Sequence, residues 1–484
     1  MIQRVQSQIL RNIANAPWFL RNTELQYNLQ MNTVKEEAQT CVTKYKHGIY
    51  LFTTFCRTSG GVVRRENGEV VVPPLLWVKA LDMVLEQLIV AGADFSTVQA
   101  LSGAAQQHGS VWWAKGADEK LSSLSSDEFI HTQLATAFTS DSPVWMDCST
   151  STHCRALEEA VGGAEELTKI TGSHAYERFT GPQIRKMYHN RLRVYQSTER
   201  ISLVSSFACS LFLGRIAPID LSDGSGMNLL DIHKKTWHQL CLKACGDETL
   251  ADKLGEPVET WTVLGNISPY YVERFGFKPD CQVVAFTGDN CSALAGLRLR
   301  SGWIGLSLGT SDTLLLGLQY PSIPLAGHVL VGPTPESPYM ALLCFSNGSL
   351  TRENHRDRLV GNSWEHFNDL LRATVRGNLG YMGKIFPNQR HEMIKKNYFN
   401  QSTIIGNGYA SLLSFNQAIK LSRLFPTGID KDLSFTSIIL FKLTTVIGSR
   451  LAKIYSCFSC RHYAGQTNVT LILALSILDY YRQV

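Results

Sequence analysis

Apolar residues along the chain occur either at helical spacing or in short continuous runs, and glycine or proline separates the two patterns. Residues 77–91 (WVKALDMVLEQLIVA) place apolar side chains three and four positions apart, which predicts a helix. Residues 97–102 then form a short apolar run that leads into a glycine turn, which predicts a buried strand. This alternation of helix and strand predicts an α/β fold.

The same alternation continues through the middle of the chain. Residues 156–170 predict one helix, which ends at Thr171 and Gly172. Residues 201–213 form an apolar segment that ends at Gly214. We expect both segments to pack into the core of the same α/β unit.

Two later apolar runs predict strands with polar ends. Residues 282–286 stop at Thr287-Gly288-Asp289, and residues 304–308 stop at Gly309-Thr310-Ser311. In open α/β sheets, ligands bind where such strands end. The pattern therefore predicts a binding region formed by the two strand ends.

Composition narrows the class of protein. The 484 residues are enough for about two or three domains. A formal net charge of +5 without a basic stripe argues against nucleic-acid binding. Twelve scattered cysteines, with no signal-peptide pattern at the start, predict a cytosolic protein. The apolar runs 435–448 and 469–478 do not predict membrane spans, because Lys442 interrupts the first and the second is too short.

Two segments carry side chains suited to a polyhydroxylated ligand. In residues 101–110 (LSGAAQQHGS), a predicted strand leads to two glutamines and His108, which can donate and accept several hydrogen bonds. A buried structural histidine is the alternative. In YERFTG, Arg178 can bind a pair of hydroxyls or a carboxylate, and a surface ion pair with its neighbour Glu177 is equally consistent with the sequence.

Asp289 and Asn290 form the most suggestive pair, because they follow a predicted strand directly. A carboxylate at this place can accept the proton of an attacking hydroxyl, and the amide can orient that hydroxyl. The alternative is a helix N-cap, a position that both residue types favour. The helix after this pair is expected to begin near Ser292.

A third glycine turn lies in residues 307–313 (SLGTSDT), where backbone N–H groups and hydroxyls could face phosphate oxygens. A plain hairpin turn is the alternative. Residues 220–228 (DLSDGSGMN) resemble a calcium loop only weakly, since the closing glutamate is absent. The pair Cys241 and Cys245 lacks the second pair that a structural zinc site requires, so we assign no metal ligands.

Taken in order, these segments resemble the xylulose kinases of the FGGY family of carbohydrate kinases. The resemblance covers residues 58–381 and rests on GG at 60, LSGAAQQHGS, SPVWMD, YERFTG, TERISLVSSF, SDGSGMNLL, VVAFTGDN and SLGTSDTLLL. It implies an actin-like, ribonuclease-H-like fold in which two α/β domains enclose a cleft. The sugar-binding domain would span residues 58–276, and a partial ATP-binding domain that includes the catalytic strand would span residues 277–381.

The resemblance also implies roles for individual residues. His108, Arg178, Asp289 and Asn290 would contact D-xylulose, and Asp289 would be the general base. For the nucleotide, the resemblance implies that Gly309 and Thr310 would approach the phosphates of ATP. It also implies that Trp364 would contact the nucleotide. Mg²⁺ would accompany ATP.

The chain departs from the family pattern in two regions. Residues 1–57 are not family-like, since they contain no Gly-x-Asp-x-Ser/Thr hairpin, and the DFST of residues 94–97 is a coincidental match. Residues 382–484 are a divergent tail without the family's Gly-Gly-Ala/Gly motif. We therefore expect the second domain to be truncated, with residues 49–55 as a candidate replacement for a missing sheet strand.

These departures leave two alternatives to a working kinase. One is a protein that binds sugar without phosphorylating it. The other is an interaction or membrane-associated protein recruited through the tail after Ser434.

Overall fold

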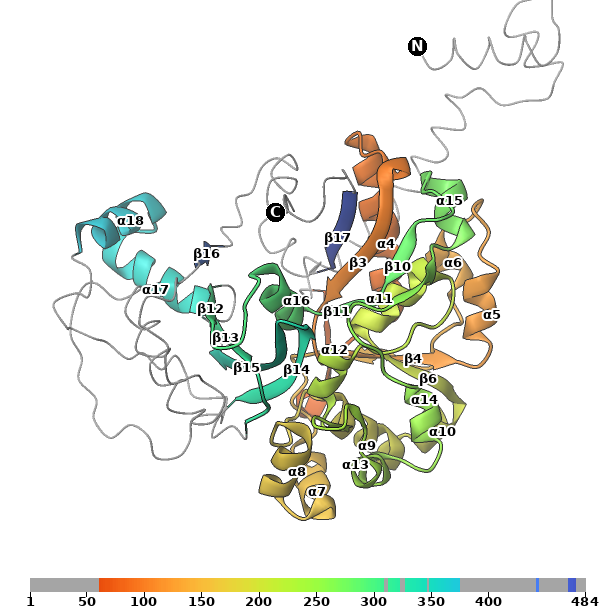
Figure 1. Ribbon diagram of the computed structural model, residues 1–484, viewed down its shortest axis with the longest axis horizontal. Helices are drawn as coiled ribbons and strands as arrows, with labels where there is room; N and C mark the ends of the chain where they lie inside the picture. Colours follow the sequence, from red (N-terminus) through yellow and green to blue (C-terminus); the bar gives the residue numbers. More distant parts are fainter. Residues whose placement is uncertain are drawn as a thin grey trace, which may run out of the picture. The chain divides into compact units, whose positions relative to one another are not determined.

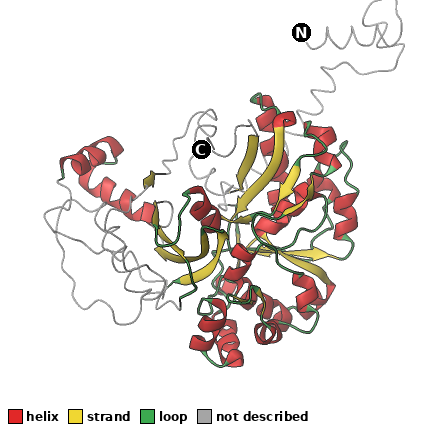
Figure 2. Ribbon diagram, viewed as in Figure 1, coloured by secondary structure: helices red, strands yellow, loops and turns green. Residues whose placement is uncertain are grey.

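The computed structural model describes residues 61–308, 312–322, 327–345, 348–374, 441–443 and 469–475. Figure 1 labels its helices and strands, and Figure 2 shows helices packed around two main groups of strands. The elements below belong to one compact unit, Val63–Ile477. None of the described helices is long and apolar enough to cross a membrane.

The first sheet is built around β3, which ends at the QQH segment. Its strands are β3 (Val98–Ala105), β9 (Val263–Asn266), β10 (Gln282–Val284), β11 (Thr287–Gly288) and β17 (Val469–Leu475). Both β10 and β11 run parallel to β3, with Val283 opposite Leu101 and Gly288 opposite Ala105. The predicted strands 97–102 and 282–286 are therefore neighbours, and their carboxyl ends lie side by side.

The other edge of β3 is occupied by a strand from the tail. Strand β17 runs parallel to β3 with Leu471 opposite Leu101 and Leu475 opposite Ala105 (Figure 1). Because β10 and β11 pair with the same stretch of β3, they must use its opposite edge. The apolar run at 469–478 thus contributes a strand to the sheet, whereas residues 49–55, the candidate replacement strand, lie outside the described residues.

The second sheet has the order β14-β15-β13-β12-β16. Its strands are β12 (Ile304–Leu308), β13 (Asp312–Leu318), β14 (His328–Thr334), β15 (Ser337–Phe345) and β16 (Phe441–Leu443). Strands β12 and β13 form an antiparallel hairpin, as the sequence around residues 307–313 predicts. The edge strand β14 is joined to the first part of the fold, because the Val329 N–H donates to the Gly172 carbonyl (2.9 Å) and the Ser222 hydroxyl donates to the Val331 carbonyl (2.7 Å).

Smaller strand groups and helices complete the fold. The short strands are β1 (Val63–Arg64), β2 (Val70–Val72), β4 (Ser110–Ala114), β5 (Ser142–Pro143), β6 (Thr198–Leu203), β7 (Leu230–Asp231) and β8 (Thr236–Trp237). The helices are α4 (Pro74–Val90), α5 (Ala117–Ser122), α6 (Ile130–Gln133), α7 (Ser151–Val161), α8 (Ala164–Thr171), α9 (Thr180–Asn190), α10 (Leu192–Ser197), α11 (Val204–Leu213), α12 (Leu221–Gly224), α13 (Gln239–Cys245), α14 (Leu250–Leu254), α15 (Pro269–Phe275), α16 (Asp289–Gly296), α17 (Gly348–Val360) and α18 (Trp364–Ala373), with 3-10 turns η1 (Glu66–Gly68), η2 (Phe95–Thr97) and η3 (Ser225–Met227).

Two sequence predictions of elements need correction, and one segment that the sequence left without an element type is now assigned. The single helix over residues 156–170 is two helices, α7 and α8, because Gly162 and Gly163 adopt φ values of 103° and 114° that end the first helix. The apolar segment 201–213 begins as strand β6, paired with β4, and becomes helix α11 only at Val204. Helix α16 begins at Asp289 rather than near Ser292.

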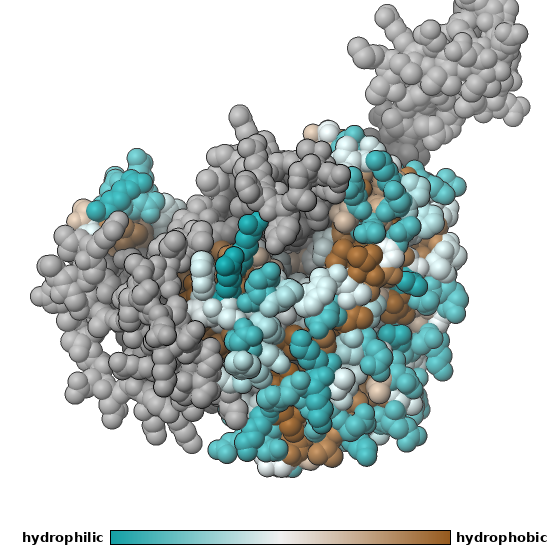
Figure 3. All heavy atoms as spheres, viewed as in Figure 1, coloured by the Kyte–Doolittle hydropathy of each residue, from teal (hydrophilic) through white to brown (hydrophobic). Residues whose placement is uncertain are grey.

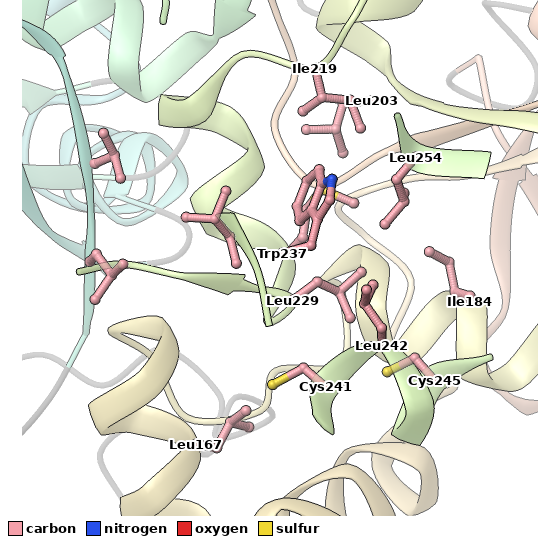
Figure 4. Packing of buried hydrophobic residues seen from close by; sticks show 14 of the residues in the cluster. Leu167, Ile184, Leu203, Ile219, Leu229, Trp237, Cys241, Leu242, Cys245 and Leu254 are labelled. Atoms are coloured by element: carbon pink, nitrogen blue, oxygen red, sulfur yellow. The ribbon is translucent and has the colours of Figure 1, made fainter. Parts of the chain in front are cut away.

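The core lies between these helices and the sheets. Figure 4 shows Trp237, Leu229, Leu242 and the cysteines Cys241 and Cys245 in one buried cluster, to which strands of the second sheet also contribute. Both cysteines are free and buried, and burial raises the pKa of Cys241 to about 12, so they pack as apolar side chains. On the face shown in Figure 3, hydrophilic and intermediate residues cover most of the described surface.

Candidate functional site

Asp289 lies where the first sheet ends, on the exposed first turn of α16. Its Oδ1 atom accepts hydrogen bonds from the backbone N–H of Asn290 (3.0 Å), from the Asn290 side-chain amide (3.3 Å) and from the backbone N–H of Gln107 (3.3 Å). Three N–H donors therefore hold one carboxylate in a fixed plane. Neither Asp289 nor Asn290 is the N-cap of α16, since that position belongs to Gly288.

Gln107 joins this carboxylate to the rest of the site. It lies two residues after the end of β3, and its buried side-chain oxygen accepts a hydrogen bond from the Asn290 amide (2.8 Å). The sequence indicated the glutamines as ligand-binding groups. In the structure Gln107 is only 3% exposed, and its side-chain amide forms hydrogen bonds with Asp223 and Asn290. It lies beside His108 in the chain, so the Asp289 and His108 halves of the site meet at this turn.

His108 adopts a positive φ of 71°, a conformation uncommon for a residue with a side chain. Its ring stacks on Phe179 with centroids 4.6 Å apart. Phe179 also contacts His328 of β14, at 4.9 Å between ring centroids. Burial, followed by the nearby positive charge of Arg178, holds the pKa of His108 well below its ordinary value. A neutral imidazole is thus available for hydrogen bonding.

Arg178 lies in the same segment as Phe179, between two aromatic rings. Its guanidinium is 4.7 Å from the ring centroid of Tyr176 and 5.8 Å from that of Trp145. No ion pair between Arg178 and Glu177 occurs in the described part of the chain. The aromatic contacts orient the guanidinium while leaving its N–H donors in their own plane, which suits the recognition of hydroxyl groups.

Two acidic residues behind Asp289 were missed by sequence reasoning, which treated residues 220–228 only as a failed metal loop. Asp220 accepts hydrogen bonds from the hydroxyls of Thr260 (2.7 Å) and Thr287 (3.0 Å). Asp223 accepts from the Ser205 hydroxyl (2.6 Å) and from the Gln107 amide (3.3 Å). The signal that could have found them is a pair of acids three positions apart among apolar and small residues.

Burial governs the ionisation of this acidic pair. Both side chains are fully enclosed, and desolvation raises the pKa of Asp220 to about 6. Desolvation, followed by the charge of Asp220, raises the pKa of Asp223 well above its ordinary value. Burial and the closeness of the two carboxyl groups therefore favour proton uptake by the Asp220–Asp223 pair as a whole.

Comparison with known proteins now identifies the family. Residues 138–296 match the N-terminal domain of the FGGY family of carbohydrate kinases. A xylulose kinase of Rattus norvegicus is 55% identical over 331 residues, which are 68% of this chain and 62% of the relative. The chain belongs to the FGGY family of carbohydrate kinases. Xylulose kinase 2 of Arabidopsis thaliana is 46% identical over 370 residues, 74% of this chain and 64% of that relative. The FGGY chain thus spans less than two thirds of the length of these two relatives.

Solved structures agree on the fold. A xylulose kinase from Rhodospirillum rubrum superposes with a TM-score of 0.55 at 14% identity, covering 65% of this chain and 61% of that one. A ligand-bound xylulose kinase from Lactobacillus acidophilus gives a TM-score of 0.53 at 16% identity, covering 66% and 61%. The prediction of an actin-like, ribonuclease-H-like α/β fold is confirmed. The domain boundaries at residues 58, 276 and 381 stay a prediction.

The nucleotide side of the FGGY site is less completely described. Gly309 and Thr310, in the hairpin between β12 and β13, lie outside the described residues. Trp364 begins α18, is 43% exposed, and lies 4.6 Å from the guanidinium of Arg356. Its ring also contacts Phe367, with ring centroids 5.7 Å apart. The structure joins Asp289 and Asn290 through Gln107 and places His108 near Arg178. The sugar roles of these four residues, like the nucleotide roles of Gly309, Thr310 and Trp364, stay predictions.

The buried histidine of β14 should make this FGGY chain less stable in acid. Burial, followed by the charge of Arg178, lowers the pKa of His328 to about 3. The unfolded chain binds this proton near pH 6.5 and the folded chain does not, so stability falls as the pH drops below about 6.5. The unfolding free energy, measured by urea unfolding, should fall between pH 7.5 and pH 5.5 in the parent. In His328→Phe this fall should be smaller by about 1 kcal/mol.

The acidic residues Asp220 and Asp223 act in the opposite direction, because their raised pKa values favour proton uptake by the folded chain. They are present in both proteins, so the difference between parent and variant isolates His328. The exposed His233 offers a matched control, and His233→Phe should keep the parent's difference. An equal loss in the parent and in His328→Phe would contradict the assignment.

Proposed function

We propose that this chain is an ATP-dependent D-xylulose kinase. It would transfer the γ-phosphoryl group of ATP to the terminal hydroxyl of D-xylulose, giving D-xylulose 5-phosphate and ADP. The observation that carries the proposal is the turn at residues 106–108, which links the Asp289 carboxylate to the ring stack beside Arg178. The names of the rat and Arabidopsis relatives supply the substrate.

The sugar would be held by His108, Arg178 and Asn290, which offer an imidazole, a guanidinium and an amide to its hydroxyls. Asp289 would act as general base. As the sugar oxygen forms its bond to the γ-phosphorus, the hydroxyl proton would pass to the Asp289 carboxylate. The bond from the γ-phosphorus to the bridging oxygen would break, and its electron pair would leave with ADP.

ATP would lie against the second sheet, with Gly309 and Thr310 near its phosphates and Trp364 near the nucleotide. Magnesium would arrive with ATP, since hard phosphate oxygens are its preferred ligands and it neutralises their charge. In the part of the chain that the structure describes, no group of three or more His, Cys, Asp or Glu residues could hold a metal.

We also place the protein in the cytosol as a sugar-metabolising enzyme without a nucleic-acid or membrane partner. Support comes from the free cysteines among the described residues, six of which, including Cys209 and Cys291, are buried. Such thiols persist in a reducing compartment. Cell fractionation of the full chain would test this placement.

The first experiment is an ADP-release assay on the purified full chain with Mg·ATP, with and without D-xylulose. The proposal expects release that depends on D-xylulose and saturates with it. Glycerol and D-ribulose provide controls for substrate range. Soluble, folded protein that releases no ADP above the sugar-free rate would overturn the kinase assignment.

A sugar-binding protein without turnover is the second candidate. The observation that favours it is the contrast between the linked pair Asp289 and Asn290, which are predicted sugar contacts, and the sequence of residues 1–57, which contains no Gly-x-Asp-x-Ser/Thr motif. Calorimetric titration with D-xylulose decides between the two. Binding without ADP release would select the binding protein.

A further inference from the structure

The amide of Gln107 has a defined direction. Its Nε2 atom donates to Asp223 Oδ1 (3.3 Å) and lies 3.4 Å from the Cys291 sulfur, while its Oε1 atom accepts from Asn290 Nδ2 (2.8 Å). A reversed amide would place an oxygen against the Asp223 acceptor and two N–H donors against each other. The acidic neighbour therefore selects one of the two orientations.

The orientation of the Gln107 amide also determines that of the Asn290 amide. Both hydrogens of the Asn290 amide have protein acceptors, Gln107 Oε1 at 2.8 Å and Asp289 Oδ1 at 3.3 Å. What Asn290 can offer a ligand is then its oxygen, which is an acceptor only. A ligand group bound there must be a donor, as a sugar hydroxyl is.

The network is packed too tightly for free rotation. Gly288, the last residue of β11, lies so close to both side chains that a Cβ atom there would fall 2.4 Å from Gln107 Cγ and 2.6 Å from Asp223 Oδ1. Gln107 is 3% exposed and Asp223 is 2% exposed. Both side chains are confined, so their relative orientation is a property of the fold rather than of an exposed surface.

We propose that Gln107 is a positioning residue for phosphoryl transfer: held by Asp223, it fixes Asn290 so that the Asn290 oxygen receives the hydroxyl of a polyhydroxylated substrate beside the Asp289 carboxylate. This inference rests on the proposed kinase function. Phosphoryl transfer depends largely on positioning, so an attacking hydroxyl that turns freely reacts more slowly. Gln107 acts through Asn290 and Asp289 and has no chemical step of its own.

The test compares two variants of the full chain. Gln107→Leu keeps most of the side-chain volume and removes both amide contacts, and it should lower kcat for D-xylulose by about tenfold or more. The double variant Gln107→Glu/Asp223→Asn restores a donor facing an acceptor between positions 107 and 223, and it leaves an oxygen for the Asn290 amide. We expect this variant to recover kcat to within about threefold of the parent.

A purely structural role predicts the reverse order, because an apolar leucine suits a buried place better than a carboxyl group. Thermal unfolding of each variant, with the exposed Gln239→Leu as matched control, shows whether any loss reflects folding. With an active parent, a Gln107→Leu variant as fast as the parent, or a double variant as slow as Gln107→Leu, overturns the positioning role alone. A parent without D-xylulose-dependent turnover overturns the proposed function and this inference with it.

Discussion

Replacing Asp289 by asparagine should lower kcat for D-xylulose-dependent ADP release by about 10²–10⁴-fold. The amide has nearly the same shape, and one of its atoms can still accept from the N–H groups of Gln107 and Asn290. It cannot take up the proton of the attacking hydroxyl. The affinity for D-xylulose, measured by calorimetry, should therefore weaken far less than turnover does.

Asp280 provides the control for this substitution. It is an exposed aspartate in the turn before β10, so Asp280→Asn makes the same chemical change at a distance from the sugar contacts. That variant should match the parent. If Asp289→Asn keeps kcat within a factor of about three of the parent, the residue is not the general base.

The sequence predicted elements well where the signal is local. Helix α4 follows from an apolar stripe that begins after Pro74 and ends before Gly92, where φ is 92°. The segment 201–213 was harder, because the last three residues of β6, 201–203 (ISL), run without a break into the apolar residues of α11. Only the long-range pairing of Ile201 with Trp112 separates strand from helix, and periodicity does not record such pairing.

The site shows a similar division. Asp289 and Asn290 were predicted as a pair because the end of a buried strand is visible in the sequence. The bridge from Asn290 through Gln107 to Asp223 was not, since residues 107, 223 and 290 are far apart in the chain. The acids were considered only as part of a calcium loop and set aside because its closing glutamate is absent. Their burial became visible only with the packing of α12 against β14 and β11.

The missing strand is the clearest case of non-local information. The resemblance indicated that a central strand of the sheet was missing, and proximity in sequence suggested residues 49–55 as its replacement. The structure instead pairs β17 with β3 from a position more than 350 residues later in the chain. A strand beside β3 needs a free backbone to pair with and apolar side chains to bury. The chain contains more than one apolar run, so the sequence alone does not show which of them takes this position.

Two prolines in β17 should therefore destabilise the sheet that carries the site. Residues 471 and 472 pair with Leu101 and Ser102, in the middle of β3. Successive N–H groups of a strand point to opposite edges, so the double variant Leu471→Pro/Ile472→Pro removes at least one donor to β3. The loss of that hydrogen bond and the unpaired carbonyl on β3 should lower the unfolding free energy by about 2 kcal/mol or more.

Urea unfolding of the full chain measures this effect, and Leu471→Val/Ile472→Val is the matched control, because it changes both side chains and keeps both N–H groups. Turnover of D-xylulose should fall together with stability, since β3 leads directly into Gln107 and His108. A proline variant as stable as the valine control would show that β17 does not pair with β3 in solution. The edge of β3 would then be open to another strand, and exposed strand edges promote association between chains.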